Sequence, residues 1–65
     1  MRSEYRLIIE QESQGAPLRV RLVGTDGHRG IVAESDPVTA LALRTAFRQI
    51  AEKLATYRDE HGKLP

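Results

Sequence analysis

The stretch DPVTALALRTAFRQIAEKLATYRDEHG, residues 36–62, predicts one long amphipathic helix around which the rest of the chain is arranged. It opens with Ser35-Asp36-Pro37, a capping side chain followed by a proline at the first helical position. It ends at Gly62, where a left-handed residue is expected, and Pro65 prevents continuation. Between these signals, apolar residues recur at steps of three and four, which places them in one stripe. The stripe consists of Ala40, Leu43, Phe47, Ile50, Leu54 and Tyr57.

Three short segments before the helix show the alternation of apolar and polar residues that indicates β-strands. They are residues 5–11, 18–23 and 29–34, separated by turns that contain glycine or proline. Short connections favour antiparallel pairing of consecutive strands, so we expect a two-layer α+β domain spanning residues 1–65. Its order is a three-stranded antiparallel β-meander followed by the helix, β-β-β-α. The side of the sheet facing the helix is expected to carry Tyr5, Leu7, Ile9, Leu18, Val20, Leu22, Ile31 and Ala33.

The predicted helix is longer than the predicted sheet. At ~1.5 Å per residue, a helix of about 25 residues spans nearly 40 Å, whereas strands of six or seven residues cover about 20–24 Å. The last turns, from about Leu54 to His61, are therefore expected to extend beyond the sheet. A chain of 65 residues without cysteine has no disulfide to stabilise a small core. We therefore expect a homodimer.

Composition argues against several classes of function. The chain has 10 Lys and Arg against 9 Asp and Glu, a net charge of +1, whereas dedicated nucleic-acid-binding domains are usually more basic. It has no cysteine and only two histidines, so neither a metal site nor another cofactor is expected. It has no apolar run of signal-peptide or membrane-spanning length, so we expect a cytoplasmic protein with no membrane partner.

Residue types suited to catalysis show no recognisable arrangement. The serines do not lie in a nucleophile elbow, and the glycines match neither a P-loop nor a dinucleotide-binding fingerprint. Asp26 and His28 allow an acid/base pair, but the Asp-Gly step between them is typical of a hairpin turn. His61 lies near the predicted end of the helix, where an imidazole suits a capping role. We therefore predict that the protein is not an enzyme.

Arginine dominates the basic residues, at eight of the ten. Arginine makes bidentate, partly desolvated contacts at interfaces, although a bias in the coding sequence gives the same composition without a physical cause. The outward side of the predicted sheet combines arginines with aliphatic residues. This composition suits a solvated face, a dimer interface, a partner surface or a phosphate-contacting surface.

The remaining class of function is a small non-catalytic regulator or inhibitor that acts by occupying a larger partner protein. The residues expected to contact the partner are Arg6, Arg19 and Arg21 on the sheet and Arg44, Arg48 and Tyr57 on the helix. The alternative is a nucleic-acid-binding regulatory protein whose sheet arginines contact phosphates. Against that alternative, the outward side of the predicted sheet has no aromatic residue for base stacking.

Two segments carry a resemblance to a known family. The strand Tyr5-Arg6-Leu7-Ile8-Ile9-Glu10 and the helix opening Ser35-Asp36-Pro37-Val38-Thr39-Ala40-Leu41 resemble the small sheet-and-helix domain of HicB-type antitoxins. The resemblance spans residues 5 to about 57 and departs from the family pattern at residues 25–30, where that family has a segment bearing proline and glycine. It implies inhibition of a partner protein, an activity also typical of small anti-activators and phage-encoded inhibitors.

Overall fold

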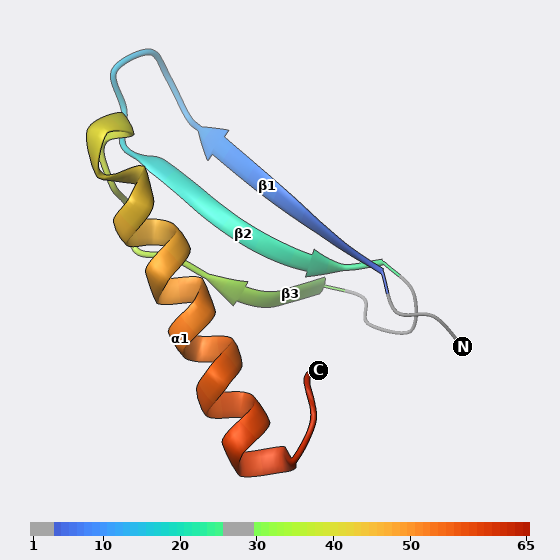
Figure 1. Ribbon diagram of the computed structural model, residues 1–65. Helices are drawn as coiled ribbons and strands as arrows, with labels where there is room; N and C mark the ends of the chain where they lie inside the picture. Colours follow the sequence, from blue (N-terminus) through green and yellow to red (C-terminus); the bar gives the residue numbers. More distant parts are fainter. Residues whose placement is uncertain (1–3, 26–29) are drawn as a thin grey trace.

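A computed structural model describes residues 4–25 and 30–65 of the chain (Figure 1). In chain order the elements are β1 (Tyr5–Gln11), β2 (Leu18–Gly24), β3 (Gly30–Glu34), a short 3₁₀ turn η1 (Ala40–Ala42) and α1 (Leu43–His61). The strands form one antiparallel sheet in the order β1-β2-β3, and α1 follows them, so the predicted β-β-β-α arrangement is confirmed. The predicted Asp26–His28 pair and the first residue of the predicted third strand lie outside the described residues.

The hydrophobic core lies between α1 and the two strands β2 and β3. An α-helix with its side chains is about 10–12 Å wide and neighbouring strands are about 4.8 Å apart, so one helix covers about two strands. Figure 1 shows β1 at the edge of the sheet that lies farther from α1. The buried apolar residues are Val20, Ala33, Ala46 and Ile50, with Leu22, Val38, Leu43 and Leu54 partly buried around them.

Three strand residues that were expected in the core are exposed. Leu7 and Ile9 on β1 are 50% and 47% exposed, because β1 lies beyond the width of the helix. Ile31 on β3 is 51% exposed. The pairing register shifts between Leu22 and Val23, which places Ile31 opposite Val23 rather than on the side that faces α1.

The apolar stripe of α1 is centred differently from the prediction. Its buried residues are Ala46 and Ile50, whereas Phe47 is 40% exposed. Phe47 lies about 100° around the helix from Ala46. It is therefore on the flank of the helix and not on the side that faces the sheet. The expectation that Phe47 is a core residue is therefore wrong, because Ala46 and Ile50 occupy the side of the helix that faces the sheet.

The helix also begins later than predicted. The Ser35 hydroxyl accepts a hydrogen bond from the backbone N–H of Val20 at 3.1 Å, and Ser35 is buried. Val38 exchanges two backbone hydrogen bonds with Leu18, as an extension of the sheet. Ser35 and Val38 are thus held by the sheet, and α1 starts only at Leu43.

The end of the helix is as predicted. Gly62 has a φ of 77°, in the left-handed region, and its N–H donates to the carbonyl of Arg58. Figure 1 shows the last turns of α1 extending past the strands, while Leu54 still packs against the core. Beyond Gly62 the chain turns back, and the hydroxyl of Tyr5 donates a hydrogen bond to the carbonyl of Pro65.

Candidate functional site

The side of the sheet that faces away from α1 carries Arg6, Arg19 and Arg21, which we call the arginine face. Strand alternation puts all three on this side, opposite to that of the buried Val20. Two of the six predicted contact residues, Arg19 and Arg21, are neighbours along β2, and Arg6 joins them from β1. The sheet therefore brings together the three arginines that the sequence pattern assigned to it.

Two carboxylates neutralise part of the arginine face. Arg21 lies 3.4 Å from Glu10 on β1, between Nη1 and Oε1, and 3.4 Å from Glu34 on β3, between Nε and Oε2. Arg19 lies opposite Glu10 in the pairing register. By contrast, the cross-strand neighbour of Arg6 is Val23, and no ion pair to Arg6 is formed within residues 4–25 and 30–65. Arg19 forms no ion pair within the described residues either, but of the three arginines Arg6 is the one with no carboxylate as a cross-strand neighbour.

The three helix residues predicted to contact a partner lie elsewhere. Arg44 and Arg48 are exposed one turn apart, on the side of α1 that points away from the sheet. Tyr57 lies near the end of α1 and stacks on His61, with ring centroids 4.0 Å apart and planes inclined by 14°. The six predicted residues therefore occupy three separate surfaces, and one flat partner cannot contact them all.

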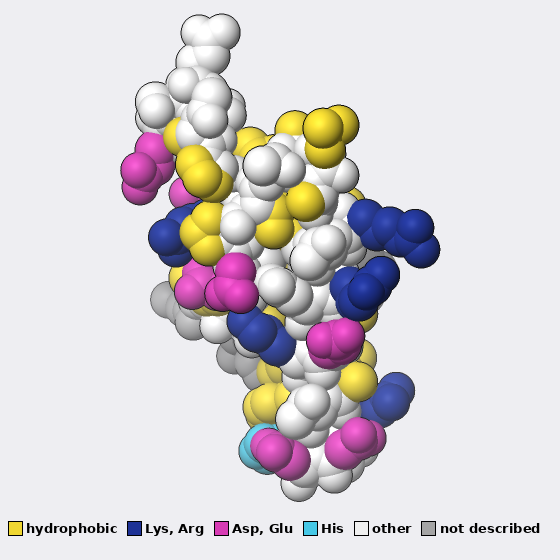
Figure 2. All heavy atoms as spheres, turned by 90° about the vertical axis from the view of Figure 1, so that its left-hand side faces the viewer, with side chains coloured by type: hydrophobic (Ala, Val, Ile, Leu, Met, Phe, Trp, Pro, Cys, Tyr) yellow, Lys and Arg dark blue, Asp and Glu magenta, His cyan; other side chains and the backbone are white. Residues whose placement is uncertain are grey.

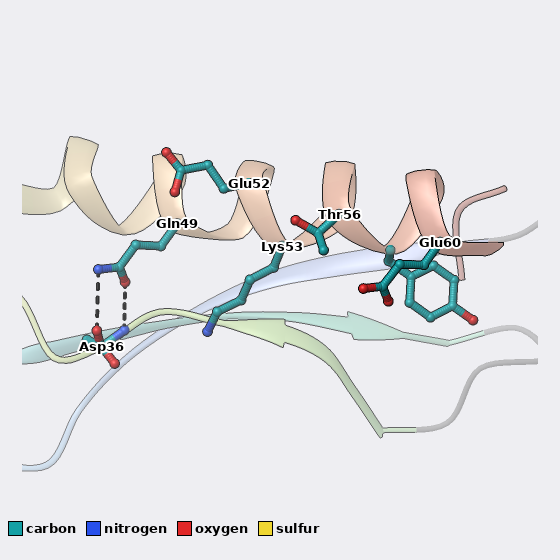
Figure 3. A pocket seen from close by; sticks show the side chains of 7 residues that line it. Asp36, Gln49, Glu52, Lys53, Thr56 and Glu60 are labelled. Atoms are coloured by element: carbon teal, nitrogen blue, oxygen red, sulfur yellow. Dashed lines mark hydrogen bonds between the residues drawn. The ribbon is translucent and has the colours of Figure 1, made fainter. Parts of the chain in front are cut away.

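A shallow groove runs along one flank of α1 and is lined by residues of α1 and by Asp36, which follows β3 (Figure 3). At one end, the Asp36 N–H donates to Oε1 of Gln49 at 2.8 Å, and Nε2 of Gln49 donates to Oδ2 of Asp36 at 3.4 Å. Next to them, the ammonium group of Lys53 donates to the backbone carbonyl of Glu34. Side chains of α1 thus cover the outer edge of β3. The lining residues are Asp36, Gln49, Glu52, Lys53, Thr56, Tyr57 and Glu60.

The groove has no evident chemistry of its own. Of its carboxylates, Glu52 and Glu60 lie about two turns apart on α1 and Asp36 lies before the helix. In the described part of the chain, no cluster of three or more His, Cys, Asp or Glu is arranged to hold a metal ion. Lys53, the cation of the groove, is already engaged by a backbone carbonyl. The hydrogen bonds of Gln49 and Lys53 beside the groove therefore hold α1 against the end of β3.

At Leu7 and Ile9, the side of β1 that faces the helix layer is exposed. Leu7 pairs with Leu22 and Ile9 pairs with Val20, so both β1 residues lie on the same side of the sheet as the core. The main contacts of α1 with the sheet are made to β2 and β3, and about half of each of these two side chains is exposed. The apolar residues of β1 therefore form a surface and not part of the core.

Phe47 extends this surface onto the helix. From one flank of α1, Lys53 reaches the last residue of β3 and Gln49 reaches Asp36 just after it. Phe47 is on the opposite flank and therefore lies on the side of β1. We call the surface formed by Leu7, Ile9 and Phe47 the apolar shelf. Sequence patterns missed it, because alternation is equally clear in β1 and β2 and does not reveal which strand the helix covers.

Comparison with known proteins does not assign a function. No family model matches the chain, and no curated protein and no solved structure is detectably similar to it. Among the residues that the structure describes, no helix is long and apolar enough to cross a membrane. Function is therefore argued from the surfaces described above.

Proposed function

We propose that this chain is a small non-catalytic protein-binding regulator that acts by occupying a larger partner protein through its apolar shelf. The observation that supports this proposal is the joint exposure of Leu7, Ile9 and Phe47 on one side of the molecule. Removing apolar surface from water is favourable, and grouped apolar side chains on a surface mark interaction sites. An aromatic side chain beside aliphatic ones is also typical of the centre of a protein–protein contact.

Blocking a surface of the partner is the mode of action that fits this site. The shelf offers apolar area but few polar groups. A partner would therefore be held by buried apolar surface and complementary shape, and not by hydrogen bonds or ion pairs. Antitoxins, anti-activators and phage-encoded inhibitors of this size act in the same manner. A partner seated on the shelf lies on the helix side of the sheet, so Arg6, Arg19 and Arg21 would contribute to a second contact on the other side.

Nucleic-acid binding is less well supported. A phosphate on the arginine face would have to compete with Glu10 and Glu34 for Arg21. On the α1 side of the molecule, which Figure 2 shows, basic and acidic side chains are interspersed with hydrophobic ones and form no extended basic area. Tyr5 lies on the helix side of β1, so no aromatic residue in the described part of the sheet is placed to stack on bases over the arginine face.

The experiment that tests the proposal compares two matched glutamate variants. Phe47→Glu places a charge on the shelf, while Thr45→Glu places the same charge on an exposed site on the other flank of α1. The wild-type chain and both variants are immobilised and exposed to lysate of the organism that encodes the chain, and bound proteins are identified by mass spectrometry. We expect at least one protein to bind the wild type and Thr45→Glu but not Phe47→Glu.

Two readouts determine how that capture is interpreted. Circular dichroism establishes that each variant is folded. If the same proteins bind all three chains equally, the shelf is not the contact surface. A parallel titration with labelled duplex and single-stranded DNA and RNA, at low salt and near 0.2 M salt, is expected to show no binding. Micromolar binding that falls steeply with salt would instead favour nucleic acid as the partner.

A further inference from the structure

The two edges of the sheet differ in how they are protected. β3 has five residues, its pairing with β2 is irregular, and Lys53 covers its outer edge at the carbonyl of Glu34. Short length, irregular pairing and a lysine are all features that discourage pairing with another chain. β1 has seven residues in unbroken register with β2 and contains no proline. β1 is therefore the edge at which another strand can be added.

The backbone groups that face this open edge can be identified. Thr25 donates to the carbonyl of Glu4 at 3.0 Å, so these two residues form a hydrogen-bonded pair. Because such pairs alternate along an antiparallel ladder, Arg6, Ile8 and Glu10 direct their backbone groups toward β2. Leu7 and Ile9 direct theirs outward, and no hydrogen bond from residues 4–25 or 30–65 reaches them there.

We infer that β1 pairs antiparallel with β1 of a second copy of this chain, with Ile8 on the two-fold axis. In this register Leu7 lies opposite the partner's Ile9, and the outward backbone groups of both residues bond each other. On the other side of the sheet, Arg6 lies opposite the partner's Glu10, and symmetry repeats the contact. Every residue of β1, from Tyr5 to Gln11, then pairs with another residue of β1.

Neighbouring registers fit less well. Moving the axis to Leu7 places Glu4 opposite the partner's Glu10, which sets like charges against each other. Moving it to Ile9 places Ile8 opposite the partner's Glu10, an apolar residue against a carboxylate. The axis at Ile8 pairs opposite charges with each other and aliphatic residues with each other. Of the three registers, this is the one that places no apolar residue opposite a charged one within β1.

Charge complementarity identifies a second copy as the occupant of the edge. Within one protomer Arg6 faces Val23 and has no ion pair in the described chain, whereas Glu10 already contacts Arg21. A second copy supplies the missing carboxylate to Arg6 of each protomer. The resulting six-stranded sheet would end at the two covered β3 edges, and the two apolar shelves would adjoin across the axis.

This inference concerns the edge of β1 and does not rest on the proposed function, which concerns the shelf. A partner protein on the shelf approaches the face of the sheet, whereas the second copy extends the sheet in its own plane. A negative result for the β1 pairing therefore does not contradict partner binding at the shelf, and a negative result for partner binding does not contradict the β1 pairing. Loss of self-pairing with retained partner capture would count against the dimer alone, and the reverse result against the proposed function alone.

A cysteine cross-link tests the register directly, since the chain has no cysteine of its own. In Ile8→Cys, the two thiols face each other across a non-hydrogen-bonded pair, with Cβ atoms about 4.5–5 Å apart. In Gln11→Cys, the thiols sit six residues out of register, about 20 Å apart. Under mild oxidation at micromolar concentration, we expect most of Ile8→Cys but little of Gln11→Cys to run as a covalent dimer on a non-reducing gel.

Every other pattern of cross-linking overturns the inference. Equal cross-linking of both variants would mean random collision, and no cross-linking of Ile8→Cys would mean that the strands do not meet. Preferential cross-linking of Gln11→Cys would mean another interface. A wild-type chain that sediments as a monomer at about 100 μM, the upper end of micromolar affinities, would exclude the dimer as well.

A charge exchange provides an independent test by sedimentation. Arg6→Glu sets two glutamates against each other, Glu10→Arg sets two arginines against each other, and each is expected to weaken the dimer by about tenfold or more. In an equimolar mixture of the two variants, the introduced glutamate lies opposite the introduced arginine, and the remaining Arg6 lies opposite the remaining Glu10. We therefore expect the mixture to form a heterodimer. Single variants that dimerise like the wild type, or a mixture of folded variants that stays monomeric, would overturn the proposed register.

Discussion

Phe47 and Ile50 lie three positions apart on α1, yet Ile50 is buried and Phe47 is substantially exposed. Large-to-small substitutions are costly where the removed atoms were enclosed, because they leave a cavity. We expect Ile50→Ala to lower the free energy of unfolding by about 2–4 kcal/mol and Phe47→Ala by only about 1–2 kcal/mol. Urea unfolding of both variants checks this order. A larger loss for Phe47→Ala would mean that the shelf is covered in solution.

Ser35 illustrates how a single hydroxyl can be redirected by tertiary structure. Its oxygen accepts the N–H of Val20, a residue that is fully buried and so lies away from bulk water. Ser35→Ala leaves that N–H without a partner and is expected to cost about 1–3 kcal/mol. Ser13→Ala, at an exposed turn position, is the matched control and is expected to change stability by less than about 0.5 kcal/mol. Equal effects in chemical denaturation would refute the role of Ser35.

At the scale of elements, the end of α1 depends on one glycine. Gly62 adopts a φ of +77°, and a Cβ built there would meet no atom within 4 Å. The cost of Gly62→Ala is therefore conformational rather than steric crowding, about 1 kcal/mol. Gly62→Asn is expected to cost less, because asparagine tolerates the left-handed region better. Thermal unfolding of the two variants checks the ranking, and equal stability of all three chains would contradict it.

The start of α1 shows the opposite case, in which local signals lose to the sheet. Asp36 and Pro37 favour a helix start, but Val38 is drawn into pairing with Leu18. Gln49 then satisfies the N–H of Asp36 from the side of the helix. The local preference for a helix start at Asp36 and Pro37 contributes about 1 kcal/mol. The backbone pairing of Val38 with Leu18 and the buried hydrogen bond of Ser35 act together against that preference.

At the scale of the whole molecule, one hydrogen bond joins the first strand to the C-terminal tail. The Tyr5 hydroxyl donates to the carbonyl of Pro65, across nearly the entire sequence. We expect Tyr5→Phe to leave the sheet and helix intact while increasing the mobility of residues 63–65, because the tail loses its anchor. NMR relaxation of the Lys63 and Leu64 amides measures this. Unchanged order parameters would show that other contacts hold the tail.

The molecule is thin, with extents of 39 × 22 × 12 Å, and four apolar residues are buried in its described part. Such a small core gives little stability by itself, so association would add to it. If the β1 pairing is correct, the unfolding midpoint should rise by several degrees between about 5 and 500 μM chain, because mass action favours the folded dimer. The variant Arg6→Glu should show a smaller rise. A midpoint independent of concentration would contradict the coupling of folding to dimerisation.

Signals within short stretches of the chain were enough to predict the elements, their order and the end of the helix. Strand alternation, turn residues and the Gly62 stop are local, since each depends on the conformation of a few adjacent residues. Alternation also assigned Arg6, Arg19 and Arg21 to one side of the sheet, which agrees with the pairing register. The antiparallel meander followed because short turns leave consecutive strands few other ways to pair.

Packing in three dimensions settles which strands α1 covers, where the helix starts, and which apolar residues stay at the surface. Leu7 and Ile9 have the same pattern as Val20 and Leu22, and only the width of one helix against three strands leaves them exposed. Phe47 likewise lies on the flank because Ala46 and Ile50 occupy the side of the helix that faces the sheet. The shelf and the open edge of β1 therefore depend on contacts between distant segments, which no local pattern encodes.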